Sequence, residues 1–194
     1  MKWFCVASNC MFLLPAYVCH KRKFIGETLF TAFTGISSIL YHGHELYDWN
    51  IHPGAIRNTD VILSFLLICH TMHCVAFYGY RWDTTIACLP FIIYACEVDI
   101  IYRLTGVIVY VICCLLCMLA NSKKYQRRFM ILGLFLGMND VAFFIIGNMS
   151  NYTILHGMHH LAVFSAQAVF MHGLCAGASS TGVSRNAVSD PTTV

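Results

Sequence analysis

Five polar residues lie near the ends of long apolar segments, where a lone polar side chain is costly. They are Ser38, His42, Asp60, His156 and His160. An ionisable side chain in lipid costs about 3 kcal/mol even on lenient insertion scales, so such residues normally have a partner. The types and the spacing of these five residues indicate that the partner is a metal ion.

The two outer histidines of the run HGMHH, His156 and His160, are four residues apart. On a helix they lie about 40° apart around the axis and roughly 6 Å apart along it, so one ion can reach both. A nitrogen from His42 would complete three ligands and leave a fourth position for water or substrate. We therefore expect Zn²⁺ bound by His42, His156 and His160. His159 is the nearest rival to His160, because an i, i+3 pair also shares a face.

Two side chains beside the expected metal could take part in chemistry. Ser38 precedes His42 by one helical turn, and Asp60 opens the next apolar segment. Either residue could hydrogen-bond a water at the metal, and Asp60 could also orient a histidine or act as a general base. Water in such a site ionises near pH 7 and can attack an acyl carbonyl. Ser38 and Asp60 are therefore the candidate catalytic residues.

Other polar residues in the apolar segments receive simpler interpretations. Asn139 and Asp140 could line the same cavity, or Asp140 could pair with Arg103, and the sequence leaves both alternatives open. Three further histidines are interpreted as helix-packing or interfacial residues and two as loop residues. The first group is His70, His73 and His172, and the second is His44 and His52.

The composition places these residues in a membrane protein. Of the 194 residues, 58% are hydrophobic and 11% are charged, whereas a soluble domain carries about 25% charged residues. The net charge of +3 is too small to indicate a nucleic-acid partner. Most cysteines fall in apolar runs and act as small hydrophobes, so we expect no disulfide framework. At Cys113, Cys114 and Cys117 helix packing is favoured over palmitoylation.

Seven apolar stretches predict an all-α, polytopic membrane protein built as a seven-transmembrane helix bundle. They cover residues 3–19, 24–41, 60–79, 84–96, 100–119, 129–147 and 153–174. Residues 1–175 form the expected transmembrane domain and residues 176–194 a disordered tail. Gly133 and Gly137 permit close helix approach, and we favour packing within the bundle over a homodimer.

The positions of the basic residues predict the orientation. The first and fifth connections carry Lys21, Arg22, Lys23, Lys123, Lys124, Arg127 and Arg128. Lys and Arg prefer cytoplasmic loops, so the amino terminus is expected outside and the carboxyl terminus in the cytoplasm. With this orientation, all five polar residues of the expected site lie at one depth near the outer leaflet.

The pattern S-x-x-x-H, then Asp, then H-x-x-x-H resembles the CREST superfamily, which includes alkaline ceramidases and adiponectin receptors. The resemblance implies a seven-helix bundle with zinc held by His42, His156 and His160, and Ser38 and Asp60 beside it. It also implies that the protein acts on membrane lipid by amide or ester hydrolysis. Whether the zinc is catalytic or structural is left open.

Within this superfamily, the runs FLLPAYVCHKRKF and YTILHGMHH resemble the myomaker group of muscle-cell fusion proteins. That resemblance implies a multi-pass plasma-membrane protein that promotes cell–cell fusion, with a fusion partner protein. The alternative is a zinc-dependent lipid hydrolase.

Overall fold

The computed structural model describes the chain over residues 2–47, 53–77, 82–90, 92–93, 100–120, 127–149 and 152–180. Within these ranges all regular structure is helical and there is no strand, which confirms the predicted all-α class. Three of the described helical segments are long and apolar enough to cross a membrane: Trp3–Lys21, Gly54–Phe77 and Arg127–Ile146. Their length and composition indicate a membrane protein.

The helices follow the apolar stretches in order. They are α1 (Lys2–Asn9), η1 (Cys10–Phe12), α2 (Leu13–Lys21), α3 (Ile25–Tyr47), α4 (Pro53–Phe77), α5 (Trp82–Ala87), α7 (Ile100–Ala120), α8 (Arg127–Met149) and α9 (Tyr152–Ser180). The first three follow one another without a break and together form the first apolar segment of the chain.

The turn after α2 reverses the chain through a Schellman motif. The backbone N–H of Phe24 donates to the carbonyl of Cys19 at 3.0 Å, and that of Lys23 donates to His20 at 2.9 Å. Lys23 has a φ of 65°, a left-handed conformation that glycine adopts most easily. The lysine costs about 1–2 kcal/mol there. The basic connection predicted from the sequence is therefore a tight turn, which sends α3 back along α2.

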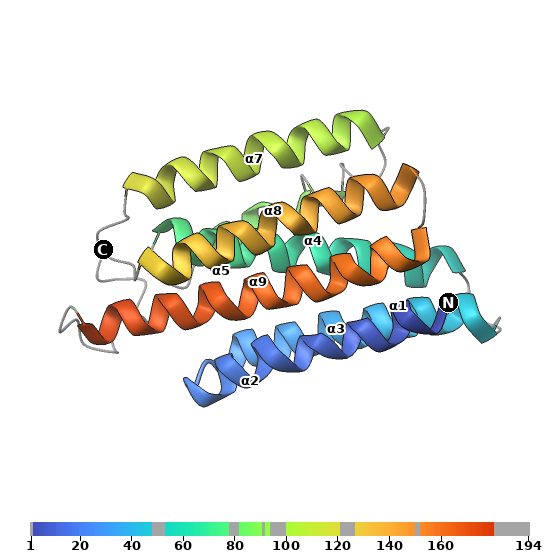
Figure 1. Cartoon of the computed structure of the whole chain (residues 1–194), viewed down its shortest axis with the longest axis horizontal. Coiled ribbons are helices and arrows are strands. Elements are labelled where there is room, and N and C mark those ends of the chain that lie inside the picture. The colour runs from blue at the N-terminus through green and yellow to red at the C-terminus, as the bar shows by residue number, and fades with distance from the viewer. Residues whose placement is uncertain are drawn as a thin grey trace.

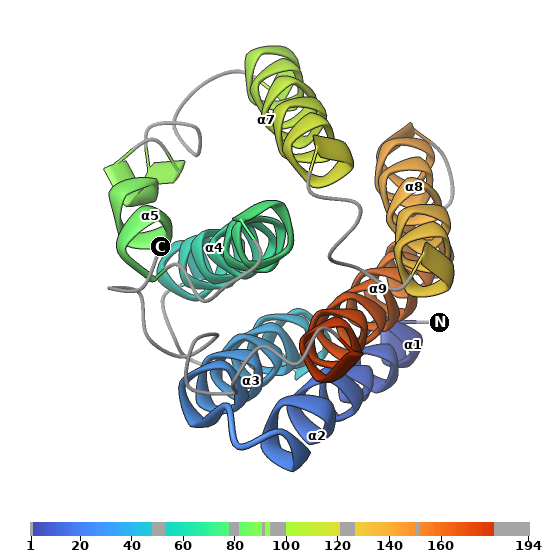
Figure 2. The ribbon, with the colours of Figure 1, turned by 90° about the vertical axis from the view of Figure 1, so that its left-hand side faces the viewer.

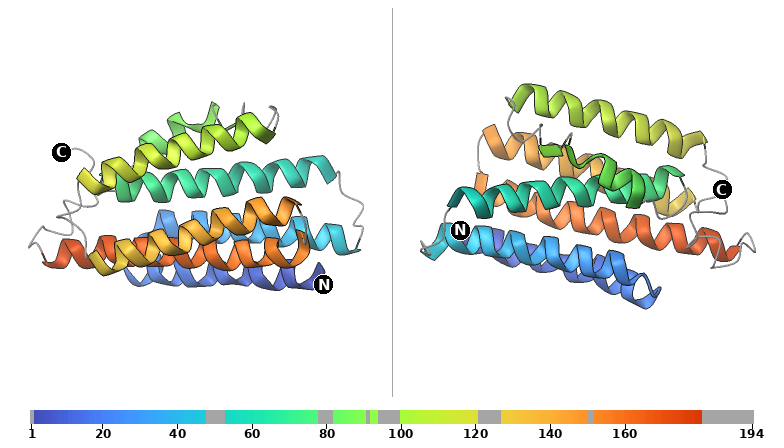
Figure 3. Two further views of the ribbon diagram at one scale, coloured as in Figure 1. Left: turned by 45° about the horizontal axis from the view of Figure 1, so that its top comes forward. Right: turned by 180° about the vertical axis from the view of Figure 1, so that it is seen from behind.

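The long helices lie side by side along one axis, as the views of Figure 3 show. Helix α9 is central: α8 packs against it on one side, and α1, α2 and α4 also contact it. Helix α3 packs against α1, α2 and α4, and α4 in turn contacts α5 and α7 (Figure 2). The end of α3 and the start of α9 lie at the same end of the bundle as the amino terminus (Figure 1).

Phenylalanine side chains fill the space over glycines where the first segment meets its neighbours. A Cβ added at Gly157 would lie 2.4 Å from the ring of Phe4, and one at Gly35 would lie 2.2 Å from Phe12. These contacts hold α1 against α9 and η1 against α3. Gly133 of α8 meets Phe170 in the same way, at 2.5 Å, so it packs within the bundle, as we favoured. A Cβ at Gly137 would meet nothing within 4 Å, so the favoured packing does not extend to Gly137.

The exterior of the bundle carries large apolar side chains. Examples are Leu29, Phe33, Leu116, Phe135 and Met138, all largely exposed. In a membrane protein such side chains face lipid. This exterior agrees with the membrane character of the helices.

Several helix ends differ from the predicted stretches. Helix α3 continues to Tyr47, so His44 is a buried helical residue and its interpretation as a loop residue was wrong. The reason is that the apolar pattern stops at Tyr41, although the helix does not. Helix α4 starts at Pro53, well before Asp60. The position of His52 lies outside the described residues.

The fourth stretch and the tail are described only in part. The fourth stretch is represented by α5 and by helical residues at 89–90 and 92–93, and its end lies outside the described ranges. Helix α9 extends to Ser180, into the segment predicted as a tail, because its small residues continue the helix. Residues 181–194 lie outside the described part of the chain.

Candidate metal centre

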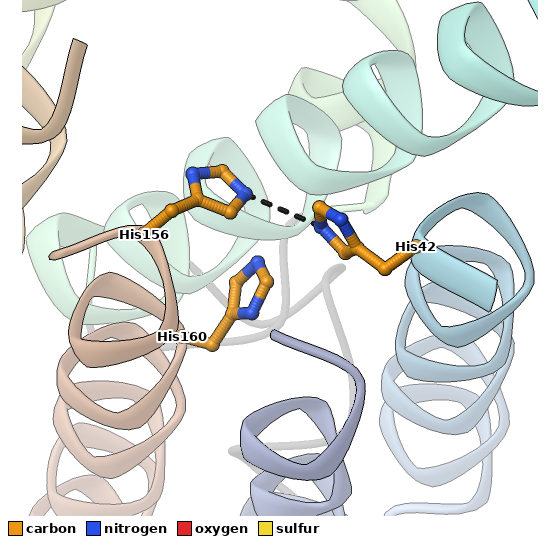
Figure 4. Close-up of side chains that lie close together, drawn as sticks. All are labelled: His42, His156 and His160. Atoms are coloured by element: carbon orange, nitrogen blue, oxygen red, sulfur yellow. Dashed lines mark hydrogen bonds between the residues drawn. The ribbon is translucent and has the colours of Figure 1, made fainter. Parts of the chain in front are cut away.

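Three imidazoles meet at the end of the bundle that holds the amino terminus. His42 comes from the last turns of α3, and His156 and His160 come from the first turns of α9. One ligand nitrogen of each histidine lies within 4.8 Å of those of the other two. Figure 4 shows the three rings pointing toward a common space between the two helices.

The contacts within this trihistidine cluster (His42, His156 and His160) are close. Nε2 of His156 lies 3.2 Å from Nε2 of His42. The ring centroid of His160 lies 5.1 Å from that of His42 and 4.6 Å from that of His156. The i, i+4 spacing on α9 places the last two rings on one face, and the antiparallel course of α3 brings His42 to the same level.

Ser38 and Asp60 are both buried beside the cluster. Asp60, in the second turn of α4, lies close enough to His42 and to the Ser38 side chain to interact electrostatically with both. Its Oδ1 is buried and has no hydrogen-bond partner among the described residues. A buried unpaired carboxylate oxygen is expensive, so this atom is available to a ligand or a water.

His159, the predicted rival of His160, faces elsewhere. It forms an ion pair with Asp140 of α8. Neither alternative for Asp140 named this partner, and the side chain of Arg103 lies outside the described residues. Asn139 bonds its own helix, donating from Nδ2 to the carbonyl of Phe135 at 2.7 Å. Asp140 therefore serves the α8–α9 contact next to the trihistidine cluster.

Two side chains that hydrogen-bond the histidines of the cluster, Glu45 and Ser8, were not predicted from the sequence. Nδ1 of His42 lies 2.9 Å from Oε2 of Glu45, and this hydrogen bond holds the pKa of the Glu45 carboxyl below its usual value. Nδ1 of His160 lies 3.2 Å from Oγ of Ser8 on α1. The i, i+3 spacing of His42 and Glu45 was a usable signal, but nothing in the sequence connects Ser8 to His160.

A small cavity adjoins the cluster. It has a volume of about 110 Å³ and is lined by Cys5, His42, Glu45, Tyr152 and Thr153. A water needs about 10–15 Å³ of such space, so the cavity can hold several waters. His42 borders both the cavity and the cluster, so a small polar group in the cavity would lie against the cluster.

The donor set fits a divalent metal such as zinc. Three imidazole nitrogens from two helices converge, and zinc commonly takes three nitrogen ligands with a fourth position open. Two of the rings are hydrogen-bonded through their other nitrogen, as metal-ligating histidines usually are. His42, His156 and His160 are the residues that would hold the ion.

A second polar cluster lies around His70, where α3, α4 and α5 meet. Nδ1 of His70 lies 2.9 Å from Oγ1 of Thr85, and its Nε2 lies 3.3 Å from Oε1 of Glu27. Trp82 donates to the same Glu27 oxygen at 2.9 Å and stacks on the His70 ring at 3.9 Å. These contacts tie α5 to α3 and α4, in agreement with a packing role for His70.

One family model matches the part of the chain that contains the whole trihistidine cluster. The model of a family described as "Protein of unknown function (DUF3522)" matches residues 1–161, which is most of the chain. The chain belongs to the DUF3522 family. No curated protein matches the chain. The DUF3522 description gives no activity, so the function of this chain has to be argued from the cluster itself.

Proposed function

We propose that this chain is a zinc-binding, multi-pass protein of the plasma membrane that promotes cell–cell fusion. The observation that carries the zinc site is the convergence of ligand nitrogens from His42, His156 and His160 within 4.8 Å. In this proposal the chain crosses the membrane seven times, with the amino terminus outside and the carboxyl terminus in the cytoplasm. The cluster then lies near the outer leaflet.

Zinc at this position would link two helices that are distant in sequence. His42 lies in the last turns of α3 and the other two ligands lie in the first turns of α9, so the ion would tie the second apolar segment to the last. Bound zinc supplies a Lewis acid and lowers the pKa of a coordinated water toward 7. The linking role needs only the three ligands, whereas a chemical role also needs Asp60.

The fusion role rests on resemblance to myomaker. The runs FLLPAYVCHKRKF and YTILHGMHH carry that resemblance. The first run forms the end of the amino-terminal helical segment and the turn into α3, and the second enters α9 with two of the histidines. The second run therefore carries two residues of the candidate site, and the first run leads into α3, which carries the third.

Expression at the surface of fibroblasts tests this proposal. The wild-type chain should produce multinucleate cells, and His42→Ala should reduce their number toward background at equal surface expression. His20→Ala is the matched control, because His20 is exposed and lies outside the cluster. A wild-type chain that reaches the surface and leaves every cell with a single nucleus would refute the fusion role.

The second candidate function is hydrolysis of a lipid amide or ester, favoured by the buried, unpartnered Oδ1 of Asp60. This oxygen can accept the proton that a water loses as it attacks an acyl carbonyl. The Ser38 side chain lies close enough to the Asp60 carboxyl to interact with it. Substrate would enter from the membrane, and the cavity beside His42 would receive its polar part.

Incubation of purified, zinc-loaded protein with ceramide or phospholipid tests hydrolysis. Fatty acid should appear, and Asp60→Asn should slow its release by about 10²–10⁴-fold with unchanged zinc content. Absence of fatty acid release from wild-type protein with bound zinc excludes this activity for these lipids. If His156→Ala removes hydrolysis but spares fusion, the two roles are separable.

A further inference from the structure

The two hydrogen bonds behind the trihistidine cluster determine where the ring hydrogens lie. A neutral imidazole has one N–H and one lone pair, and only the lone pair can bind a metal. Which nitrogen carries the hydrogen is set by the partner of the other nitrogen. Ser8 and Glu45 are those partners for His160 and His42.

The hydrogen bonds of Ser8 favour acceptance from His160. The Ser8 hydroxyl has a single hydrogen, and the carbonyl of Cys5 lies at 3.0 Å to accept it. With that donation, the contact of 3.2 Å between Ser8 Oγ and His160 Nδ1 runs from ring N–H to hydroxyl oxygen. His160 therefore carries its hydrogen on Nδ1 and presents the lone pair on Nε2.

Glu45 has the same effect on His42. An ionised carboxylate accepts and does not donate, so the contact of 2.9 Å places the His42 hydrogen on Nδ1. The Nε2 lone pair of His42 then faces His156. Because that lone pair accepts at 3.2 Å, Nε2 of His156 must carry a hydrogen in the metal-free protein.

We propose that Ser8 and Glu45 are positioning residues that fix His160 and His42 in the metal-binding tautomer before an ion arrives, and that His156 is the ligand that switches. This inference rests on the proposed zinc site. His156 is held differently from the other two, by stacking of its ring on Tyr152 at 4.7 Å with the planes 18° apart. Coordination of an ion by both Nε2 atoms would require the hydrogen of His156 to lie on Nδ1 instead, with no net change in protonation.

The proposal gives the first helix a role in the metal site. Ser8 lies on α1 and is buried, and α1 contacts both α3 and α9. The Phe4 ring of α1 packs against Gly157, one residue after His156. The packing that holds α1 in the bundle therefore also places Ser8 beside His160.

The test uses full-length protein in detergent, with zinc affinity measured by competition against a chelating dye. Ser8→Ala and Glu45→Ala should each weaken zinc binding about 10–100-fold, as loss of an outer-shell partner does, with the stoichiometry unchanged. Glu45→Gln, whose amide oxygen still accepts from Nδ1, should recover most of the affinity, and so should Ser8→Thr. Gly137→Ala is the control, since a Cβ there meets nothing within 4 Å.

A second readout does not need the metal. Nitrogen NMR of the metal-free, ¹⁵N-histidine-labelled protein distinguishes Nδ1–H from Nε2–H rings. Wild type should show His42 and His160 as Nδ1–H and His156 as Nε2–H, and Ser8→Ala should mix the His160 signal.

The outcomes separate this inference from the zinc site itself. Wild-type protein that binds one zinc, with Ser8→Ala and Glu45→Ala binding it equally tightly, overturns the positioning role and leaves the site intact. Wild-type protein that binds no zinc overturns the site and, with it, the switching role of His156. The opposite tautomers in the metal-free spectrum overturn the assignment whatever the affinities are.

Discussion

A histidine hydrogen-bonded to a glutamate occurs in both polar clusters of the bundle, with different surroundings. In the cluster around His70, Thr85 and Glu27 occupy the two ring nitrogens, and Trp82 covers the ring. In the trihistidine cluster, Glu45 occupies only the Nδ1 side of His42. The Nε2 side of His42 faces His156 rather than an acidic or hydroxyl group.

The difference separates a structural cluster from a ligand site. Where protein groups satisfy a buried imidazole on both sides, it holds helices together and has no lone pair for a ligand. Where several imidazole nitrogens converge and a nearby carboxylate oxygen stays unpaired, these polar groups are available to a ligand. Both clusters are polar and buried, so burial of a histidine alone does not identify a metal ligand.

The largest expected effect is on zinc content, which should depend on the trihistidine cluster and not on the cluster around His70. The double variant His42→Ala/His160→Ala should lose zinc, with affinity reduced by more than about 100-fold, because it removes two ligands rather than an outer-shell partner. His70→Ala should retain about one zinc per chain. Elemental analysis of purified protein measures both. Zinc lost equally from the two variants would contradict the distinction.

The second prediction compares the two histidine–glutamate pairs by their contribution to stability, and here the larger effect is expected in the cluster around His70. Glu27→Ala removes the group that contacts His70 Nε2 and Trp82 Nε1, which should lower the free energy of unfolding by about 1–3 kcal/mol for each donor left unpaired. Glu45→Ala should cost only about 0–1 kcal/mol in zinc-free protein, because the Glu45 side chain is 37% exposed. Thermal unfolding in detergent with a chelator present compares them. Equal losses would show that the two pairs are energetically alike.

A third prediction concerns the response to zinc. Zinc at about 100 times its dissociation constant should stabilise the wild-type protein by about 2.7 kcal/mol, because only the folded state holds the site. Glu27→Ala should keep this increment although it starts from a lower stability, and the double variant should lose it. The unfolding temperature with and without zinc is the measurement. An equal rise in the double variant would indicate binding elsewhere.

The sequence predicted the trihistidine cluster because it depends on helix periodicity and on the order of the helices. His156 and His160 share a face by their spacing, and the antiparallel course of α3 and α9 brings His42 to the same level. Glu45 was missed because the predicted segment ended at Tyr41, where the apolar pattern stops, and the helix continues to Tyr47. Backbone hydrogen bonding extends helices beyond their apolar part, and hydropathy does not report it.

Ser8 and Glu27 were missed for another reason. Each pairs with a histidine far along the chain, Ser8 with His160 and Glu27 with His70. Such pairs depend on which helices are neighbours, and that depends on the shapes of the contacting surfaces. Phe4 over Gly157 sets the place of α1, and no periodic pattern in either helix reports this contact.

The smallest predicted effect tests this shape-dependent contact directly. In Gly157→Ala the new Cβ would lie 2.4 Å from the Phe4 ring, so Phe4 and α1 must shift. Overpacking of this kind costs about 1–3 kcal/mol.

The control, Gly137→Ala, makes the same change on α8 with nothing within 4 Å. It should be neutral or up to about 1 kcal/mol stabilising, because alanine favours helix more than glycine does. Because α1 carries Ser8, Gly157→Ala should also weaken zinc binding, whereas Gly137→Ala should leave it unchanged. Thermal unfolding and dye competition on the two variants measure both effects. A Gly157→Ala protein with wild-type stability and wild-type zinc affinity would show that α1 is not held by this contact.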